Sequence, residues 1–366
     1  MKLSSLLLLF SFLLAAINFS AADGFDVALP PSYPTEPPVG DPWSGLRVFD
    51  VSDYGAVADG KTNDTLALMA AWEDACYNEG ESMLLIPEGN YLVDQITLSG
   101  PCFSDLSPKV LILGTLIAPT NLTADVWIHF HSLPRLSLTA GHLSTIDGQG
   151  AQTWSSGSAC RRALTCPMFA TVIIIYLEYQ SFFACAVQSL KLSNVLNGTV
   201  SNINLVDSKG FHVSIFQCDN IHFSGFNITA PWNSQNTDGI HISQSTNINI
   251  TNSNIGVGDD CVSIGPGSVN VSVSNVTCGP GHGISIGSLG KYKMEKDVIG
   301  IRVENCTING TQNGVRVKTW PGDLGSNATN LTFQNIVMIN VSNPIIIDQQ
   351  YCPNHSCDTR ELNQAM

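Results

Sequence analysis

A short pattern of alternating apolar and polar residues recurs through the C-terminal half of the chain. Its copies are spaced 23 to 30 residues apart and begin at Ile221, Ile248, Val271, Ile301 and Leu331. Such alternation at period two predicts a strand with one buried face. A second short apolar strand follows each copy, as in Ile240-His-Ile242 and Val262-Ser-Ile264.

Repeats of this length, built from short strands with Gly and Asn between them, predict an all-β solenoid, a right-handed parallel β-helix in which each repeat forms one coil. A short N-terminal helix is expected to cap it. A β-sandwich is the alternative, but a sandwich predicts hairpin turns rather than such regular recurrence.

Composition supports this interpretation. Only 13% of the 366 residues are charged, against about 25% in ordinary soluble proteins. Stacked coils bury an inward apolar column, while Asn, Ser and Thr fill the outward columns and turns. A hydrophobic fraction of 44% excludes disorder for most of the chain. The net charge of −14 disfavours a nucleic-acid-binding protein, which would show a basic surplus.

The N-terminal region predicts secretion. Residues 1–22 combine an early lysine, an apolar run and small residues spaced as in a cleavage site, which is typical of a signal peptide and too short for a membrane span. The alternative is a buried N-terminal helix. Residues 23–47 are rich in proline and predict a linker or pro-segment. Residues 48–366 then form the β-helix domain.

Cysteines and asparagines also fit a secreted protein. The eleven cysteines suit an oxidising compartment, and because the number is odd at least one lacks a disulfide partner. Sequons of the form Asn-x-Ser/Thr predict a glycoprotein, with ladders of stacked asparagines as the alternative. Seven of them begin at Asn63, Asn121, Asn197, Asn227, Asn249, Asn270 and Asn275.

Chemically active side chains recur at or just before the second strand of successive repeats. Because neighbouring coils stack about 4.8 Å apart, residues spread over 80 positions should converge on one face. Three carboxylates and an imidazole suit cleavage of a glycosidic bond, in which one acid protonates the leaving oxygen and another carboxylate activates water or attacks. Crowding raises the pKa of one such acid, and two cations suit an anionic sugar. The residues are Asp238, Asp259, Asp260, His282, Arg316 and Lys318.

Each motif alone has a plainer interpretation. An Asp pair is typical of a solvated turn or a Ca²⁺ ligand, Gly-His-Gly of a loop, and Arg-x-Lys of a solvated strand. Their equivalent places in successive coils favour one shared site. The adjacent cations disfavour a metal there, so neither a metal nor another cofactor is expected. Cys261 is expected to pair with Cys278 rather than to act as a nucleophile.

Four motifs of this region occur together: Asn236-Thr-Asp238, Gly258-Asp-Asp260, Gly281-His-Gly283 and Arg316-Val-Lys318. Together they resemble the motifs of the polygalacturonases, the pectin-hydrolysing glycoside hydrolases, and the longer strings around them resemble plant members. The resemblance runs from about Phe49 to Cys357.

The resemblance implies a right-handed parallel β-helix that hydrolyses α-1,4 galacturonan bonds with inversion. It implies that Asp259 is the general acid, that Asp238 and Asp260 activate water, and that His282 supports the acid. Inversion predicts acid and base carboxyl groups about 6.5–9.5 Å apart. The remaining residues are implied to bind substrate: Arg316, Lys318, Tyr351 and Asn236.

The same resemblance implies a monomer without a cofactor that is secreted to the cell wall and binds pectin. No association with nucleic acid is expected, and none with a membrane once the signal peptide is removed. The alternatives are a rhamnogalacturonan hydrolase, a pectin lyase that uses Arg or Lys as base, usually with Ca²⁺, or a truncated β-helix that only binds the wall.

Two features depart from the family pattern. Residues 168–189 form an atypical apolar segment containing Cys185, a candidate for the cysteine without a partner, and we expect an aberrant insertion such as retained intron sequence. Family members continue for several coils past Tyr351, whereas this sequence stops at Met366. Because a last coil without a cap exposes apolar core and strand edges, we expect a product of reduced stability or activity.

Overall fold

The computed structural model describes residues 45–103, 106–122, 124–155, 187–322 and 325–353. The chain divides into the units 1–44 and 45–366, and all described residues belong to the second. The predicted signal peptide, most of the predicted linker and insertion, and Cys185 lie outside the described residues. Within the described part, no helix is long and apolar enough to cross a membrane.

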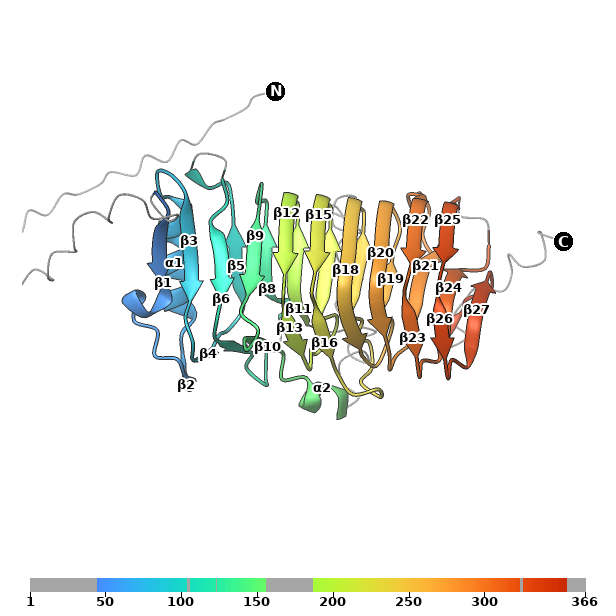
Figure 1. Cartoon of the computed structure of the whole chain (residues 1–366), viewed down its shortest axis with the longest axis horizontal. Coiled ribbons are helices and arrows are strands. Elements are labelled where there is room, and N and C mark those ends of the chain that lie inside the picture. Colours follow the sequence, from blue (N-terminus) through green and yellow to red (C-terminus); the bar gives the residue numbers. More distant parts are fainter. Residues whose placement is uncertain (1–44, 104–105, 123, 156–186, 323–324, 354–366) are drawn as a thin grey trace, which may run out of the picture. The chain divides into compact units, whose positions relative to one another are not determined.

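The unit is a parallel β-helix whose coils contribute strands to three faces (Figure 1). Two faces belong to one 18-stranded sheet, because β18 (Thr246–Gly256) and β20 (Val269–Cys278) run through the corner between them. The first face contains the remaining strands β1 (Arg47–Asp50), β3 (Ser82–Ile86), β6 (Lys109–Ile112), β9 (Ser137–Ala140), β12 (Leu196–Ser201), β15 (Asp219–Ser224), β22 (Val298–Glu304) and β25 (Ala328–Gln334).

The second face is built from shorter strands in the same register from coil to coil. They are β2 (Asp59–Asn63), β4 (Asn90–Leu92), β7 (Thr115–Ile117), β10 (Thr145–Asp147), β13 (Asn204–Val206), β16 (Asn227–Thr229), β23 (Thr307–Asn309) and β26 (Val337–Ile339).

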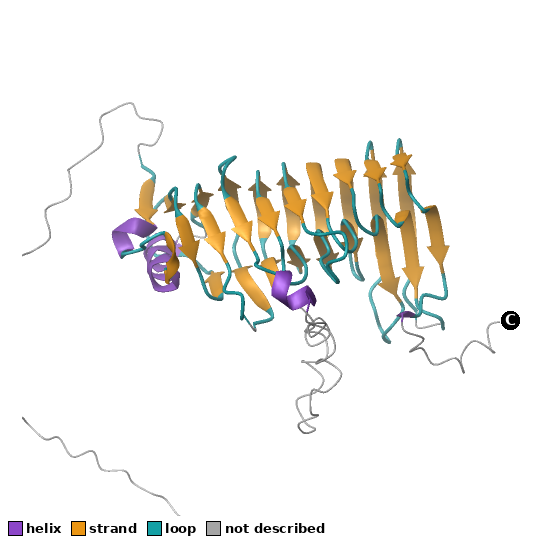
Figure 2. Ribbon diagram, turned by 90° about the horizontal axis from the view of Figure 1, so that it is seen from below, coloured by secondary structure: helices purple, strands orange, loops and turns teal. Residues whose placement is uncertain are grey.

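The third face is a separate nine-stranded sheet. Its strands are β5 (Ile96–Ser99), β8 (Val126–His131), β11 (Gln188–Ser193), β14 (Val213–Phe216), β17 (Ile240–Ser243), β19 (Val262–Ile264), β21 (Ile284–Leu289), β24 (Asn313–Thr319) and β27 (Asn343–Asp348). Figure 2 shows the successive coils stacked along one axis. The strands pair in parallel, as the repeat predicts.

Aligned aliphatic side chains form the core. On the third face Val213, Ile240, Val262, Ile284 and Val315 occupy the same register position in five successive strands, and all five are buried. Burying one such side chain contributes about 1.5–3 kcal/mol. The alternation seen in the sequence therefore reflects an inward column that continues from coil to coil.

Asparagines form ladders at the edge of the first face. Asn220 Nδ2 donates to Asn197 Oδ1 at 2.8 Å, and Asn270 Nδ2 donates to Asn247 Oδ1 at 3.3 Å. All four have φ between 55° and 57°, a left-handed conformation that asparagine tolerates better than most residues. This confirms ladders that include two of the sequon asparagines, Asn197 and Asn270.

The two ends of the described β-helix differ. Helix α1 (Thr65–Cys76) packs at the N-terminal end against β1, β3 and β5, and Cys76 is disulfide-bonded to Cys102. This confirms the expected helix cap. The further helical elements are η1 (Val51–Tyr54) and α2 (Ala151–Ser155). In β27, Ile345 and Ile347 continue the inward column but are 72% and 73% exposed.

Candidate active site

The four predicted catalytic residues lie in equivalent loops between the second and third faces, whereas Arg316 and Lys318 lie on β24. Asp238 precedes β17, the Asp259-Asp260 pair precedes β19, and His282 precedes β21. Main-chain hydrogen bonds tie these loops together, because Gly239 N–H donates to Asp260 O at 2.9 Å and His282 N–H donates to Asp259 O at 2.7 Å. The predicted convergence on one face is confirmed.

The loop that carries Asp259 and Asp260 requires glycine at position 258. A Cβ added at Gly258 would lie 1.9 Å from the carbonyl oxygen of Ser234 in the preceding loop. Only glycine permits this close approach of two backbones. Cys261, directly after the acid pair, is disulfide-bonded to Cys278, as the sequence predicted. The chain next to Asp259 and Asp260 is thus held by backbone packing and by a covalent bond.

Asp260 is buried and bonded to two cations. Lys318 Nζ donates to its Oδ2 at 2.8 Å, and Arg316 Nη2 donates to its Oδ1 at 3.0 Å. The Ser285 hydroxyl also donates to Oδ1, at 2.7 Å. Burial alone would raise the pKa of Asp260, but attraction to the Lys318 ammonium and the Arg316 guanidinium outweighs it and lowers that pKa below its ordinary value. Asp260 is therefore ionised at neutral pH.

Asp238 has a different environment. Burial, and then repulsion from Asp259 and Asp260, raises its pKa well above the ordinary value. Its Oδ2 accepts a hydrogen bond from the Ser263 hydroxyl at 2.6 Å. The Ser263 oxygen also lies 2.8 Å from His241 Nδ1. Burial lowers the pKa of His241 to about 4, so its ring is neutral.

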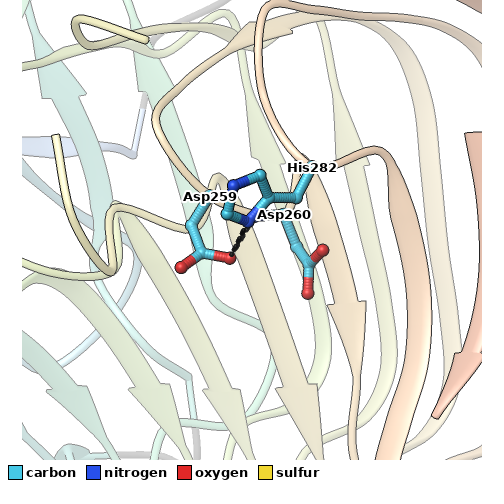
Figure 3. Close-up of side chains that lie close together, drawn as sticks. All are labelled: Asp259, Asp260 and His282. Carbon is cyan, nitrogen blue, oxygen red and sulfur yellow. Dashed lines mark hydrogen bonds and ion pairs between the residues drawn. The ribbon is translucent and has the colours of Figure 1, made fainter. Parts of the chain in front are cut away.

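Asp259 and His282 form a pair at the opening of the site. Figure 3 shows the Asp259 carboxylate facing the His282 ring, with Asp260 pointing away. Asp259 Oδ1 lies 3.0 Å from His282 Nδ1. The hydrogen bond to Asp259 raises the pKa of His282 above 6.5, although partial burial opposes the shift. The pair therefore holds a proton at a pH where an ordinary histidine has lost it.

A pocket of about 890 Å³ lies over this pair. Of the three carboxylates, Asp259 lines it, whereas Asp238 and Asp260 are buried. His282 and the predicted substrate-binding residue Asn236 also line it. A concave site with convergent polar groups and perturbed pKa values is typical of an active site.

The remaining predicted residue, Tyr351, lies next to Lys318. The Lys318 ammonium is 5.3 Å from the centre of the Tyr351 ring, and the Tyr351 N–H donates to Thr319 O at 3.0 Å. Trp320 contacts the same ring edge-on, with ring centres 5.9 Å apart. The structure therefore brings all the predicted site residues to one region of the molecule.

The sequence analysis missed three polar residues that orient the carboxylates: Ser263, Ser285 and His241. Each lies at the outward position between two inward apolar residues of β19, β21 or β17, and they share one register position with Arg316. The sequence did contain a signal for them: polar residues that recur at aligned outward positions next to an acidic motif indicate side chains that hydrogen-bond to its carboxylates.

Asp259, Asp260 and His282 offer one ligand atom each within 4.8 Å of one another, as a metal site would require. Both oxygens of Asp260 already accept hydrogen bonds from cations, however, and His282 is bonded to Asp259. A metal would have to displace these contacts and lie beside Arg316 and Lys318. This donor set fits acid–base chemistry better than metal binding.

The distance between Asp259 and Asp260 bears on stereochemistry. The oxygen of Asp259 and the oxygen of Asp260 in this set lie within 4.8 Å of each other. This approach of single atoms is shorter than the separation of about 6.5–9.5 Å expected between the two carboxyl groups of an inverting pair. The configuration of the product is therefore the property to measure.

Comparison with known proteins places the chain in a family. The family model for glycosyl hydrolases family 28 matches residues 76–181 and 184–364. An exopolygalacturonase of Platanus acerifolia is 42% identical over 317 residues, which cover 86% of this chain and 78% of the relative. A polygalacturonase of Nicotiana tabacum is 39% identical over 318 residues, covering 86% and 74%.

Solved structures share the fold. The polygalacturonase from Erwinia carotovora superposes with a TM-score of 0.64 at 23% identity, covering 87% of this chain and 83% of that one. The exopolygalacturonase from Thermotoga maritima gives 0.65 at 16% identity, covering 83% and 78%. The predicted right-handed parallel β-helix is confirmed. This chain is a glycoside hydrolase and belongs to glycosyl hydrolases family 28.

Proposed function

We propose that this protein hydrolyses α-1,4 galacturonosyl bonds in polygalacturonan, the main chain of pectin, with inversion. The observation that carries the proposal is the arrangement of the Asp259–His282 pair at the pocket, beside the buried Asp260 that two cations keep ionised. Relatives about 40% identical are named polygalacturonases and exopolygalacturonases, which supports this substrate class.

Asp259 is the proposed general acid. The states His282⁺·Asp259⁻ and His282·Asp259-H contain the same number of protons and differ by one transfer along a 3.0 Å hydrogen bond. The raised pKa of His282 therefore keeps an acidic proton in the pair. Asp259 lines the pocket and can deliver this proton to the leaving oxygen, while His282 holds its geometry.

Asp260 is the proposed carboxylate that activates the attacking water. Its Oδ1 accepts two hydrogen bonds and its Oδ2 accepts one from Lys318, which leaves an acceptor position on Oδ2 for a water. Asp238 keeps its proton at a pH where Asp260 is ionised. We therefore assign the first proton abstraction to Asp260, with Asp238 as its partner in orienting the water.

Arg316 and Lys318 support an anionic sugar as the proposed substrate. Arg316 and Lys318 are only partly neutralised by one shared carboxylate, Asp260, since two positive charges face one negative charge. A galacturonate carboxylate would neutralise the remaining positive charge through charge-assisted hydrogen bonds. Tyr351, next to Lys318, and Asn236, in the pocket lining, complete the proposed substrate contacts.

The test is product analysis after incubation of the full chain with polygalacturonate and, separately, with a rhamnogalacturonan. We expect new reducing ends from polygalacturonate alone, without ultraviolet-absorbing unsaturated products. Unsaturated products would indicate a lyase. Cleavage of rhamnogalacturonan alone would indicate the related hydrolase, and binding without cleavage would indicate a wall-binding protein.

A proton NMR time course on the first products tests inversion. Because the substrate bonds are α, inversion predicts that the β anomer forms first and then equilibrates. Initial formation of the α anomer would show retention, which would assign Asp260 to nucleophilic attack rather than to water activation.

We further propose that the protein is secreted to the cell wall, with residues 1–22 as the signal peptide and residues 23–47 as the linker. Secretion is supported by the form of the N-terminal sequence and by the disulfides Cys76–Cys102 and Cys261–Cys278. Expression with a C-terminal fluorescent tag and N-terminal sequencing of the mature protein would test it. An intracellular product that retains residues 1–22 would refute it.

A further inference from the structure

An exposed tryptophan lies at the edge of the pocket. Trp232 is 74% exposed, and it lines the same pocket as Asp259 and His282. Fully burying such a side chain would be favourable, yet here the ring contributes little to the apolar core. A large amphipathic ring beside a polar concave site is a typical contact for a ligand with an apolar face.

The loop that carries Trp232 is held in place by its own hydrogen bonds. The Ser234 N–H donates to Pro231 O at 3.0 Å, and the Thr237 hydroxyl donates to Ser234 O at 3.0 Å. Ser234 and Thr237 are buried, and their hydroxyl oxygens are 2.7 Å apart. The Gly258 N–H donates to Thr237 Oγ1 at 3.0 Å, which ties this loop to the loop of Asp259. The backbone that carries Trp232 is therefore held by these bonds, so little backbone entropy is lost when a ligand binds the ring.

The position of Trp232 along the β-helix places it on the opposite side of the reaction centre from the cations. Its loop precedes β17, the Asp259 loop precedes β19, and Arg316 and Lys318 lie on β24, three strands beyond β17 in the order β24-β21-β19-β17 of the third sheet. A chain of sugars lying along the axis would meet Trp232 on the N-terminal side and the cations on the C-terminal side.

We propose that Trp232 is a substrate-binding residue that stacks on the pyranose ring of a sugar unit. This unit lies between the cleaved bond and the N-terminal end of the β-helix. This inference rests on the proposed function and adds a contact of a different chemical kind. A sugar presents C–H groups on one ring face, and an indole packs on them whatever the charge at C6. Trp232 therefore supplies affinity that does not depend on the uronate carboxylate, whereas Arg316 and Lys318 recognise that carboxylate.

The test compares Trp232→Ala and Trp232→Phe with the parent enzyme on oligogalacturonides. We expect Trp232→Ala to raise KM about threefold to tenfold, equivalent to the usual strength of an aromatic contact, with kcat changed less than about twofold. Trp232→Phe should recover most of the affinity. Tyr77→Ala is the matched control, since Tyr77 is a 65% exposed aromatic residue on the N-terminal helix cap, and it should match the parent.

Binding measured in the Asp259→Asn background separates this inference from the proposed function. The dissociation constants of a neutral, fully methyl-esterified oligomer and of the acid form should rise by the same factor in Trp232→Ala. Trp232→Ala indistinguishable from Tyr77→Ala, with an active parent, would overturn the stacking role alone. A parent that neither binds nor cleaves galacturonides would overturn both proposals.

Discussion

Lys318 Nζ lies 2.8 Å from Asp260 Oδ2, and the two side chains are only 8% and 2% exposed. The residues are 58 positions apart in the sequence, yet the stacking of coils brings β24 beside the loop that precedes β19. Without Lys318, Asp260 would remain buried with Arg316 as its cation, but the loss of a buried, charged hydrogen bond is still more costly than the loss of a surface pair.

The first prediction concerns this pair. Lys318→Met should lower the free energy of unfolding by about 1.5–3 kcal/mol and raise the pKa of Asp260, because Lys318 is its strongest attractive partner. The matched control is Lys109→Met, which breaks the exposed pair of Lys109 with Glu81 and should cost less than about 1 kcal/mol. Denaturant unfolding of both variants checks this; equal losses would contradict the assignment of a buried charge pair.

The stabilisation that the Lys318–Asp260 pair gives the fold depends on pH. Because the pKa of Asp260 is lower in the folded protein than its ordinary 3.8, the pair stabilises the fold fully above that value. The contribution is lost as the pH falls through the lowered pKa. Lys318→Met should therefore begin acid unfolding at a higher pH than the parent, and an unchanged acid transition would argue against it.

The second prediction concerns the pH dependence of the reaction. The pKa of His282 is raised above 6.5 by its hydrogen bond to Asp259, so the acidic proton leaves the pair only as the pH rises through that higher value. We expect kcat/KM to decline on the alkaline side at a pH above 6.5. His282→Gln should lower kcat/KM by roughly tenfold or more and move this alkaline decline to lower pH, because Asp259 then holds the proton without the imidazole.

The control for His282 is His222→Gln, because His222 is exposed on β15 of the first face, away from the third-face loops. Its pH profile should match that of the parent. An alkaline decline that stays at the same pH in His282→Gln would show that a group outside the Asp259–His282 pair sets it.

The third prediction compares two isoleucines that share one column of the core. Ile284 of β21 and Ile345 of β27 both align with Val315, but Ile284 is fully buried whereas Ile345 is 72% exposed. Ile284→Ala should cost about 2–5 kcal/mol. Ile345→Ala should cost less than about 1 kcal/mol, because little burial is lost. Thermal unfolding of the two variants checks this, and similar losses would show that β27 is covered in solution.

The sequence predicted those parts of the fold that periodicity encodes. The strands beginning near Ile221, Ile248 and Val271 appear as β15, β18 and β20, and the short strands that follow them form the third face. Convergence of Asp238, Asp259 and His282 followed from the same repeat. Before residue 200 the repeat is less regular, and the sequence analysis did not place the individual strands there.

The rest of the site depends on burial, which periodicity does not give. Burial raises the pKa of both Asp238 and Asp260; repulsion from two carboxylates adds to this at Asp238, whereas attraction to two cations outweighs it at Asp260. Neither environment exists until the coils stack. Trp232 was also missed, since a single aromatic residue in a loop has no periodic signal, and its significance comes from the pocket that it lines.

The central claim is that Asp259 protonates the leaving oxygen, and the most direct measurement is the hydrolysis rate of Asp259→Asn on polygalacturonate beside its affinity for the same substrate. The variant preserves the size of the side chain but removes the transferable proton. We predict a loss of about 10²- to 10⁴-fold in kcat with affinity unchanged within about threefold. An Asp259→Asn enzyme that hydrolyses polygalacturonate at the parent rate would contradict the account.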